Sequence, residues 1–328
     1  MSRYQGDQSK FGFSYESGTY GTASGAAQWP GIVQNSDVID EVNSMSSRYV
    51  GGNTRDVEIH FNTVQDSTLN FSTWVQDWRM LGFALGSMVT TGSPTYSHAL
   101  TAVNSDSSNG FTSGTSAPFV SFSAQASKNF NPTGLNFNKT INGCIVNTLS
   151  IDWVEKQPVV MTVNAVGQST TYSSGASYAP TANTERPYLT SDMVMGIPSG
   201  TPVRFLKKAT FNISQNVTAN HYVNGSTVVE LPYPGNRDYG LDITVDSSTE
   251  QEKTFYDSYF IAGSTFNAHI RTAKSSTRAC DIFLSGCKIS KMTDPLSFEG
   301  AQESTLTIVP STVNAVVVDT GLVTYGAW

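Results

Sequence analysis

Few residues of this chain have the types and spacing that catalysis or metal binding requires. No serine lies in a GxSxG motif, and neither a Walker motif nor a GxGxxG nucleotide-binding motif is present. The histidines are scattered, and none belongs to an HExxH motif or lies beside a cysteine at metal-ligand spacing. They are His60, His98, His221 and His269. The sequence therefore predicts no metal, no cofactor and no nucleophilic catalysis.

Acidic residues offer one further kind of chemistry, because glycoside hydrolysis uses two carboxylates roughly 5–10 Å apart. The acids that a β scaffold could bring together are Asp56, Glu58 and Asp66 in the first half and Asp238, Asp242 and Asp246 in the second. In residues 242–246 the acids alternate with Ile243 and Val245, which places them on the solvent-exposed face of a strand. This alternation favours an ordinary sheet surface and leaves a hydrolase as the weaker alternative.

Length and composition indicate an all-β protein with two domains. The 328 residues exceed the usual ~100–200 of one domain, and only 14% are charged, against ~25% in typical proteins. Ser, Thr, Asn and Gly are plentiful, and no long helical pattern of Glu, Lys and Ala occurs. With a formal charge of -7, the chain has no basic stripe that could hold nucleic acid, whereas a mildly acidic surface would let DNA pass without adhering.

The N-terminus and the cysteines bear on where the chain is made. Residues 1–7 contain no apolar signal-peptide core, and no window approaches the ~18 apolar residues that span a bilayer. We expect a soluble chain made in a cytoplasm. Cys144, Cys280 and Cys287 have no CxxC spacing, and their odd number does not suggest a complete disulfide framework, so they are predicted to be small buried apolar residues.

Hydrophobic periodicity predicts the elements that would position these residues. Period-two alternation and apolar runs predict strands at residues 56–61, 69–73, 119–125, 143–153 and 158–166. Between Val75 and Ser87 the apolar positions fit a short helix that Gly86 would end. One helix packed on a sheet is therefore the expected structural unit.

Residues 1–30 form a polar, glycine-rich arm that is too short of apolar residues to fold alone. It carries the aromatic residues Phe11, Phe13, Tyr15 and Tyr20. These side chains could anchor the arm on another subunit, since aromatic residues are enriched at interfaces. Alternatively, the arm wraps its own domain. The sequence leaves both alternatives open.

Two short motifs recur in the same order in the second half. Arg55-Asp56 returns as Arg237-Asp238, and Gly143-Cys144 returns as Gly286-Cys287. The two Arg-Asp pairs lie further apart in the chain than the two Gly-Cys pairs, which predicts extra residues in the first copy, in the loop that follows Gly86. Each Arg-Asp pair could clamp a domain or subunit border bidentately, or be an ordinary surface ion pair worth about 0–1 kcal/mol.

This repeat predicts tandem domains joined by a turn-rich linker at residues 168–182. The predicted divisions are an N-terminal arm at 1–30, a first β domain at 31–168 with a long inserted loop at 89–117, and a second β domain at 183–328.

The residues from Arg48 to Val57 and from Trp74 to Ser87 together resemble the tail tube proteins of long-tailed, siphovirus-like bacterial and archaeal viruses. Further segments similar to that family are Tyr20-Gly21-Thr22, Trp29, residues 143–149 and the strand that begins at Pro158. The match covers most of the first half in order and the second half loosely. The second half lacks the Trp-rich helix signature, so its equivalence with the first rests on pattern alone.

The resemblance implies β-sandwich or barrel-like units with one or two short flanking helices, whose sheets join those of neighbouring copies into a ring around a channel. Rings would stack into a virion tail tube that is assembled in the host cytoplasm and through which DNA passes without stable binding. Six units usually surround the channel, so a duplicated chain would form a trimer and an unduplicated one a hexamer. Tape measure and tail terminator proteins would be further partners.

On this hypothesis the functional residues lie at contacts between copies and along the channel. The expected contacts between rings or subunits are Phe11, Tyr15, Tyr20, Trp29, Arg55, Asp56, Trp78, Arg237 and Asp238. The expected channel wall includes Glu58, His60, Asp242, Thr244 and Asp246. A carbohydrate-binding or adhesin-like β-sandwich is the main alternative, because it would also account for the aromatic residues and polar loops.

Overall fold

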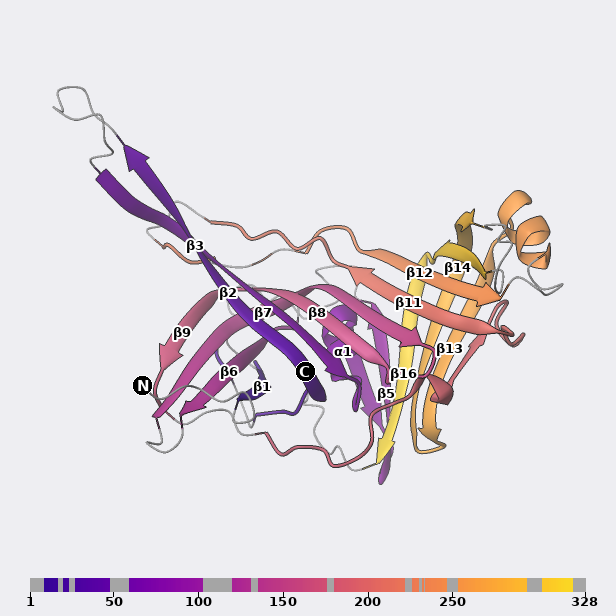
Figure 1. The fold of residues 1–328 in the computed structure, drawn as a ribbon, viewed down its shortest axis with the longest axis horizontal. Coiled ribbons are helices and arrows are strands. Elements are labelled where there is room, and N and C mark those ends of the chain that lie inside the picture. Colours follow the sequence, from indigo (N-terminus) through magenta and orange to yellow (C-terminus); the bar gives the residue numbers. More distant parts are fainter. Residues whose placement is uncertain are drawn as a thin grey trace.

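The computed structural model describes residues 9–16, 20–23, 27–47, 59–102, 120–130, 135–175, 180–221, 226–229, 232, 234–246, 253–293 and 303–320. In this part of the chain the protein is predominantly β, as the sequence predicted. Its strands are β1 to β16, and its helical turns are α1, η3 (Thr190–Asp192) and η4 (Figure 1).

Four antiparallel strands form the central layer of the first half. In spatial order they are β2 (Ile32–Ser47), β3 (Ile59–Trp74), β8 (Val160–Gly167) and β7 (Leu135–Val154). The long strand β7 continues into a second layer, where it pairs with β6 and β9, and β6 pairs with β1. These strands are β6 (Phe122–Phe130), β9 (Ser169–Ser173) and β1 (Lys10–Tyr15).

The second half repeats this pairing order strand for strand. Its central layer consists of β11 (Leu206–Ser214), β12 (Asp238–Asp246), β15 (Glu303–Val309) and β14 (Arg278–Thr293). Here β14 is the long strand that continues into a second layer, between β13 and β16, while β10 pairs with β13. These strands are β13 (Phe266–Ser275), β16 (Thr312–Thr320) and β10 (Met193–Gly196).

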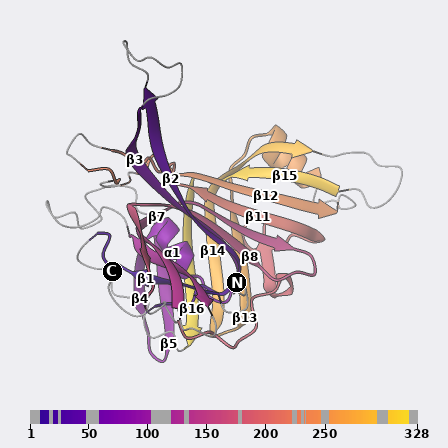
Figure 2. The ribbon, with the colours of Figure 1, turned by 60° about the vertical axis from the view of Figure 1, so that its left-hand side comes forward.

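The two halves are joined at two places. Strand β7 pairs with β11, so the central layers form one row of eight strands, β2-β3-β8-β7-β11-β12-β15-β14. In the second layers, β16 pairs with β5 (Thr95–Ala102), and β5 pairs with β4 (Gly86–Thr91). Figures 1 and 2 show that β13 and β16 cross the row of eight at a steep angle, and residues 279–285 of β14 pair with β16 in that second layer. The result is a two-layered sheet structure with the core between the layers.

Strands β7 and β14 can be aligned without gaps, starting from Gly143-Cys144 in β7 and Gly286-Cys287 in β14. Gly143-Cys144 lies opposite Phe122, and Gly286-Cys287 lies opposite Phe266; both cysteines are fully buried. Gly143 and Gly286 have φ values of 67° and 63°, which favour glycine, at the point where each strand leaves one layer for the other. Both strands then carry a bulge three to five residues later.

The Arg-Asp pairs do not correspond in the same way. Ala165 and Ile308 lie equally far beyond the matched bends, and they pair with Leu69 and Leu241, so these two leucines occupy equivalent positions. The residue equivalent to Asp238 is then Asp66 and not Asp56, and aligning the two Arg-Asp pairs was wrong. The two aspartates also have equivalent hydrogen bonds. Asp66 accepts from the side-chain amide of Asn43, and Asp238 accepts from that of Asn216. Each asparagine lies two residues beyond the residue that pairs with the aspartate across the strands.

The helix expected between Val75 and Ser87 is present as α1 (Arg79–Leu85). All seven of its residues are buried, and Gly86 ends it in the left-handed conformation with φ 94°. The equivalent position in the second half is occupied by η4 (Phe255–Ile261), of which only Phe255 is buried. The inserted residues predicted after Gly86 include β4 and β5, which join the second layer of the other half, whereas residues 103–119 lie outside the described part.

The arm and the predicted linker both take part in the first half. Strand β1 pairs with β6 inside the same chain, and Phe11 and Phe13 are buried in its core. Of the two alternatives for the arm, the structure thus shows β1 packed on its own chain. Residues 169–173, predicted to be linker, form β9 because Asn138 to Asn142 of β7 provide a strand edge for them.

Candidate functional site

The row of eight strands has one face on the core and one face open. Along β12, Leu241, Ile243 and Val245 are buried, and the residues between them are partly exposed. The register places these alternating residues in rows that cross the sheet. One such row contains Asp152, Thr210, Asp242, Thr307 and Lys291, on β7, β11, β12, β15 and β14. The open face therefore consists of side chains contributed by both halves of the chain.

Hydrogen bonds link polar side chains across the open face. Thr210 Oγ1 donates to Asp152 Oδ1 at 2.6 Å, and Thr307 Oγ1 donates to Asp242 Oδ1 at 2.7 Å. A second series crosses the first half, where the side-chain amide of Asn164 donates to Asn70. In these bonds each carboxylate accepts from a threonine on the neighbouring strand. None of them joins two carboxylates to each other.

Acidic residues outnumber basic ones on this face. The carboxylates at its positions are Asp37, Glu41, Asp66, Asp152, Asp238, Asp242, Asp246 and Glu303. The lysines are Lys208, Lys288 and Lys291, together with Lys207, which reaches Glu303 from the bulge of β11 at 2.6 Å. An excess of carboxylates repels polyanions, and the many Ser, Thr and Asn side chains give them no fixed positive partner.

The predicted channel residues are distributed over two regions. Asp242, Thr244 and Asp246 lie together on the open face of β12. His60 lies in the part of β3 that pairs with β2 alone, in the hairpin that projects from the body in Figure 1, and its side chain is exposed. Glu58 lies outside the described residues. Asp37, Glu41 and Asp152 also lie on the open face. The sequence prediction did not include them, although alternation within their strands was a usable signal.

Two of the predicted contact residues are buried within the chain. Phe11 is 6% exposed and packs on Phe71, with ring centroids 5.0 Å apart. Trp78 is 1% exposed and packs on Tyr188 at 5.3 Å. Because their own chain covers both rings, the structure places these two in the core and not on a surface that a neighbour could reach.

The other aromatic contact candidates are half-buried and bound within the chain. Tyr15 stacks on Phe83 of α1 at 5.6 Å between ring centroids. The Tyr20 hydroxyl donates to the carbonyl of Gly143 at 2.8 Å, and burial raises the pKa of Tyr20 above its ordinary value. Trp29 belongs to a hydrogen-bonded network at the end of the arm. Their contacts with other subunits stay a prediction.

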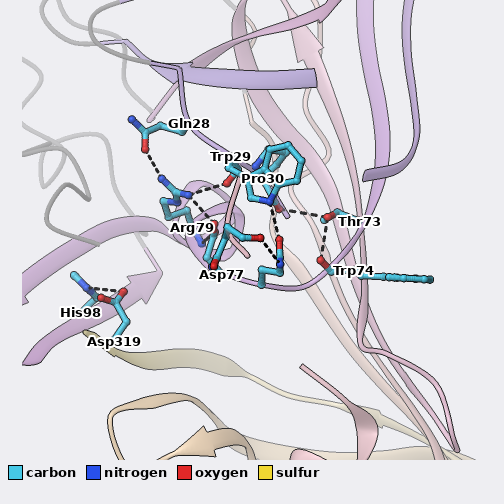
Figure 3. Close-up of polar contacts among 11 residues, drawn as sticks. Gln28, Trp29, Pro30, Thr73, Trp74, Asp77, Arg79, His98 and Asp319 are labelled. Atoms are coloured by element: carbon cyan, nitrogen blue, oxygen red, sulfur yellow. Dashed lines mark hydrogen bonds and ion pairs between the residues drawn. The ribbon is translucent and has the colours of Figure 1, made fainter. Parts of the chain in front are cut away.

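A buried ion pair holds the end of the arm against α1 (Figure 3). Arg79 Nη2 lies 2.7 Å from Asp77 Oδ2, and the same guanidinium donates to the carbonyl of Trp29 at 2.7 Å and to the side chain of Gln28. The Trp29 indole donates to Gln76 Oε1 at 2.7 Å. This network fixes the segment that leads into β2, and the sequence prediction missed it because its members are far apart in the chain.

Glu16 is a second residue that the sequence prediction missed. Its carboxylate accepts hydrogen bonds from the backbone amide of Gly143 at 2.7 Å, from Ser121 at 2.6 Å and from Ser123. In the second half, Asn267 Oδ1 accepts from the amide of Gly286 at 3.2 Å. A side-chain oxygen therefore satisfies the backbone at the bend of both long strands.

The Arg-Asp motifs differ in what the structure shows of them. Arg55 and Asp56 lie outside the described residues. Arg237 is half-buried, and Asp238 is exposed at the beginning of β12, where it accepts from Asn216 at 2.9 Å. Their clamping of a subunit border stays a prediction.

Other kinds of site have little support in the described residues. These residues contain no group of three His, Cys, Asp or Glu side chains that could hold a metal ion. A hollow of about 300 Å³ lies between β10 and β11, where Trp153, Met195, Val203 and Phe205 line it and Lys207 is the charged residue. Such a lining lacks the paired acids that glycoside hydrolysis needs.

None of the helices in the described ranges is both long and apolar enough to span a membrane.

Comparison with known families identifies the class of protein to which this chain belongs. Residues 6–308 match the model of the phage tail tube protein family, which is nearly the whole chain. The chain belongs to the phage tail tube protein family. It is therefore a structural component of a viral tail, and the resemblance found in the sequence is confirmed. No curated protein matched the chain.

Proposed function

We propose that copies of this tail tube protein assemble into rings, that the rings stack into a tube, and that DNA passes along the open face of the row of eight strands. The observation that carries the proposal is the continuity of this row through both halves. It ends in two strand edges on one chain, and joining such edges between copies is the way to close a sheet into a ring.

The acidic open face supports its placement toward the channel. Binding to DNA grows with the number of lysines and arginines that neutralise phosphates, and here carboxylates exceed lysines along the strands. A polyanion in such a channel would be kept from the wall and could move through it. The repeated pairing order also favours three chains per ring, because each chain then supplies two of six similar units.

The proposed role is architectural and not enzymatic. On the open face, Asp152 and Asp242 accept hydrogen bonds from neighbouring threonines and Asp238 accepts one from Asn216, as in an ordinary polar sheet. The projecting β2–β3 hairpin supports contacts between stacked rings, since it extends beyond the body with exposed Phe61 and Val42. Tape measure and tail terminator proteins are the proposed partners inside and at the end of the tube, in a virion tail assembled in the host cytoplasm.

Electron microscopy of the purified protein tests the assembly. We expect rings and tubes with an open channel at high protein concentration, and threefold symmetry with six similar lobes in end-on views. A monomer that stays dispersed in sedimentation velocity at high concentration, and that is retained on glycan columns, would overturn the proposal in favour of a carbohydrate-binding module.

Selective labelling tests which face lines the channel. Thr244→Cys places a thiol on the open face of β12, and Asn314→Cys places one on the exposed side of β16. The native cysteines are buried, so they give little background. On preassembled tubes, a bulky maleimide-polyethylene glycol should label Asn314→Cys and spare Thr244→Cys, while dissociated protein should label at both. Equal labelling of both variants in intact tubes would exclude this orientation.

A further inference from the structure

We propose that neighbouring copies join by antiparallel pairing of β2 in one copy with residues 290–293 of β14 in the next, in the register that places Lys291 opposite Glu41 of the neighbouring copy. This inference rests on the proposed ring and specifies how it closes. It assigns a surface, a partner and a register that the sequence prediction did not contain.

The junction inside the chain is the template. Strand β7 pairs with β11 over seven residue pairs, from Val154 opposite Lys208 to Thr148 opposite Ser214. In the repeated pairing order, β7 corresponds to β14, and β11 corresponds to β2. The internal junction thus joins the last strand of one unit to the first strand of the next. Repeating it between copies joins β14 to β2.

The correspondence also fixes the register. Val146 and Thr148 flank the bulge of β7, and Ile289 and Lys291 flank that of β14, so Thr148 corresponds to Lys291.

The bulges of the two first strands align β2 with β11 in the same way. The bulge of β2 lies between Val33 and Asn35, and that of β11 lies between Leu206 and Lys208. The far ends of the strands agree with this alignment, because Ser214 pairs with Asp238 as Glu41 pairs with Asp66. Ser214 therefore corresponds to Glu41.

Transferring the internal pairs to the two open edges gives a short list of expected partners. Thr148 opposite Ser214 becomes Lys291 opposite Glu41, and the next alternating pair becomes Thr293 opposite Ile39. The Gln215 amide donates to the carbonyl of Asn147 at 2.8 Å, which predicts the same bond from Val42 to Ser290 of the neighbouring copy.

In the described part of the chain no further strand pairs with either edge, and the Lys139 ammonium donates to one β2 carbonyl, that of Val38. There β2 pairs with β3 alone, and residues 288–293 pair with β15 alone. On β2, the apolar side chains of Ile39 and Val42 are 41% and 46% exposed. An unpaired strand edge with exposed apolar side chains is prone to pairing with another chain. An edge of this kind needs a partner, and a second copy supplies one: within the described residues, three of the seven internal pairs transfer, placing 291–293 opposite 41–39.

Charge selects this pairing over the symmetric ones. On its open face the β2 edge carries Asp37 and Glu41, and the β14 edge carries Lys288 and Lys291. Pairing β2 with β2 would place acids beside acids, and pairing β14 with β14 would place lysines beside lysines; both arrangements are unfavourable. Only the mixed junction brings opposite charges together. A mixed, head-to-tail junction is also the kind that closes a ring.

Charge reversal tests the register in solution. Glu41→Lys should raise the protein concentration needed for ring formation roughly tenfold, because two lysines then face each other. Lys291→Glu should do the same. The double variant restores the opposite charges and should assemble within about twofold of the wild type. As a matched control, Lys156→Glu changes an exposed lysine of the β7–β8 turn and should assemble normally.

Cysteine pairs give a second, geometric readout. Residues directly opposite in antiparallel strands have Cα atoms roughly 4.5–5.5 Å apart, which is within the range for a disulfide. The pair Ile39→Cys with Thr293→Cys should cross-link between copies on mild oxidation of assembled protein. The out-of-register pair Glu41→Cys with Thr293→Cys should not, and neither should any single variant.

The outcomes separate this inference from the proposed function. Wild-type protein that forms no rings at any concentration defeats the proposed function itself. Rings that form while the double charge variant is no better than the single ones, or that cross-link only through the out-of-register pair, overturn the register and leave the proposed function standing. Rescue by the double variant together with the matched cross-link supports the inference.

Discussion

The two halves of the molecule share a strand order but bury their helices to different extents. Every residue of α1 is buried, and its Arg79 is bound to Asp77 and to the segment that leads into β2. In contrast, η4 exposes Ile261 by 63% and keeps only Phe255 buried. The same topology therefore supports a helix that belongs to the core and one that lies on the surface. The pairing pattern, and not the helix, is the common element.

The same comparison at the central strands shows what an edge position requires. Asp40 on β2 and Ile213 on β11 occupy equivalent positions in the matched register. Ile213 is 1% exposed, and β11 has a strand on each side. On the edge strand the equivalent Asp40 instead binds Lys139 at 3.0 Å and Tyr172 at 2.7 Å. At these two equivalent positions, the strand with neighbours on both sides carries an apolar residue and the edge strand carries a charged residue with partners.

Replacing Arg79 should have the largest effect on this contrast. Arg79→Met leaves the Asp77 carboxylate buried without its cation and releases the Trp29 carbonyl, so the free energy of unfolding should fall by about 3–5 kcal/mol. Its counterpart is Lys253→Met, which removes an exposed ion pair to Asp257 at 3.7 Å beside η4 and should cost about 0.5 kcal/mol or less. Urea unfolding of unassembled protein measures both, and equal losses would refute the contrast.

Truncating a helix side chain should have the next largest effect. Leu81→Ala in α1 opens a cavity in the core and should lower the free energy of unfolding by about 2–5 kcal/mol. Ile261→Ala in η4 removes an exposed side chain and should change it by about 0.5 kcal/mol or less. The shift in unfolding midpoint measured by circular dichroism checks both variants. A costly Ile261→Ala would mean that η4 is more tightly packed than its exposure indicates.

The bend glycines test how closely the two halves match. Gly143→Ala and Gly286→Ala should each cost about 1–2 kcal/mol, because both residues have positive φ. Gly143→Ala should cost more, since the added Cβ would lie 2.7 Å from the Tyr20 ring, whereas at Gly286 it meets the side chain of Ser311. Gly175→Ala, in open space, is the control. Midpoints from thermal unfolding report the order, and a harmless Gly143→Ala would contradict it.

Much of this arrangement could be predicted from local sequence. Alternation identified parts of β3, β6, β7, β8 and β12 but not β1 or β2. Gly86 identified the end of α1, and Gly143-Cys144 with Gly286-Cys287 identified the matched bends, because each of these signals depends on neighbouring residues. The Arg-Asp anchors failed because a two-residue motif recurs by chance: the position equivalent to Asp238 is Asp66, and Arg55-Asp56 lies earlier in the chain. The burial of Phe11 and the pairing of β7 with β11 depend on contacts between distant segments, for which the local pattern contains no signal.

The smallest expected effect concerns the edge residue Asp40. Burial would raise the pKa of this carboxyl, but hydrogen bonds from Thr170, Tyr172 and Lys139 together with the charge of Lys139 outweigh it, so the pKa is lowered. Ionised Asp40 therefore stabilises the fold above the unfolded pKa of about 3.9, and this stabilisation is lost as pH falls through the lower folded value. Asp40→Asn should cost about 1 kcal/mol at neutral pH.

The pH dependence distinguishes this ion pair from simple packing. The difference in unfolding midpoint between wild type and Asp40→Asn should be constant above about pH 5 and should vanish toward about pH 2, where both side chains are neutral. Asp37→Asn, on the exposed face of the same strand, is the control and should show a smaller difference at every pH. A loss that stays the same at all pH values would show that Asp40 acts through its shape. The edge position would then not need a charge, and the contrast with Ile213 would fail.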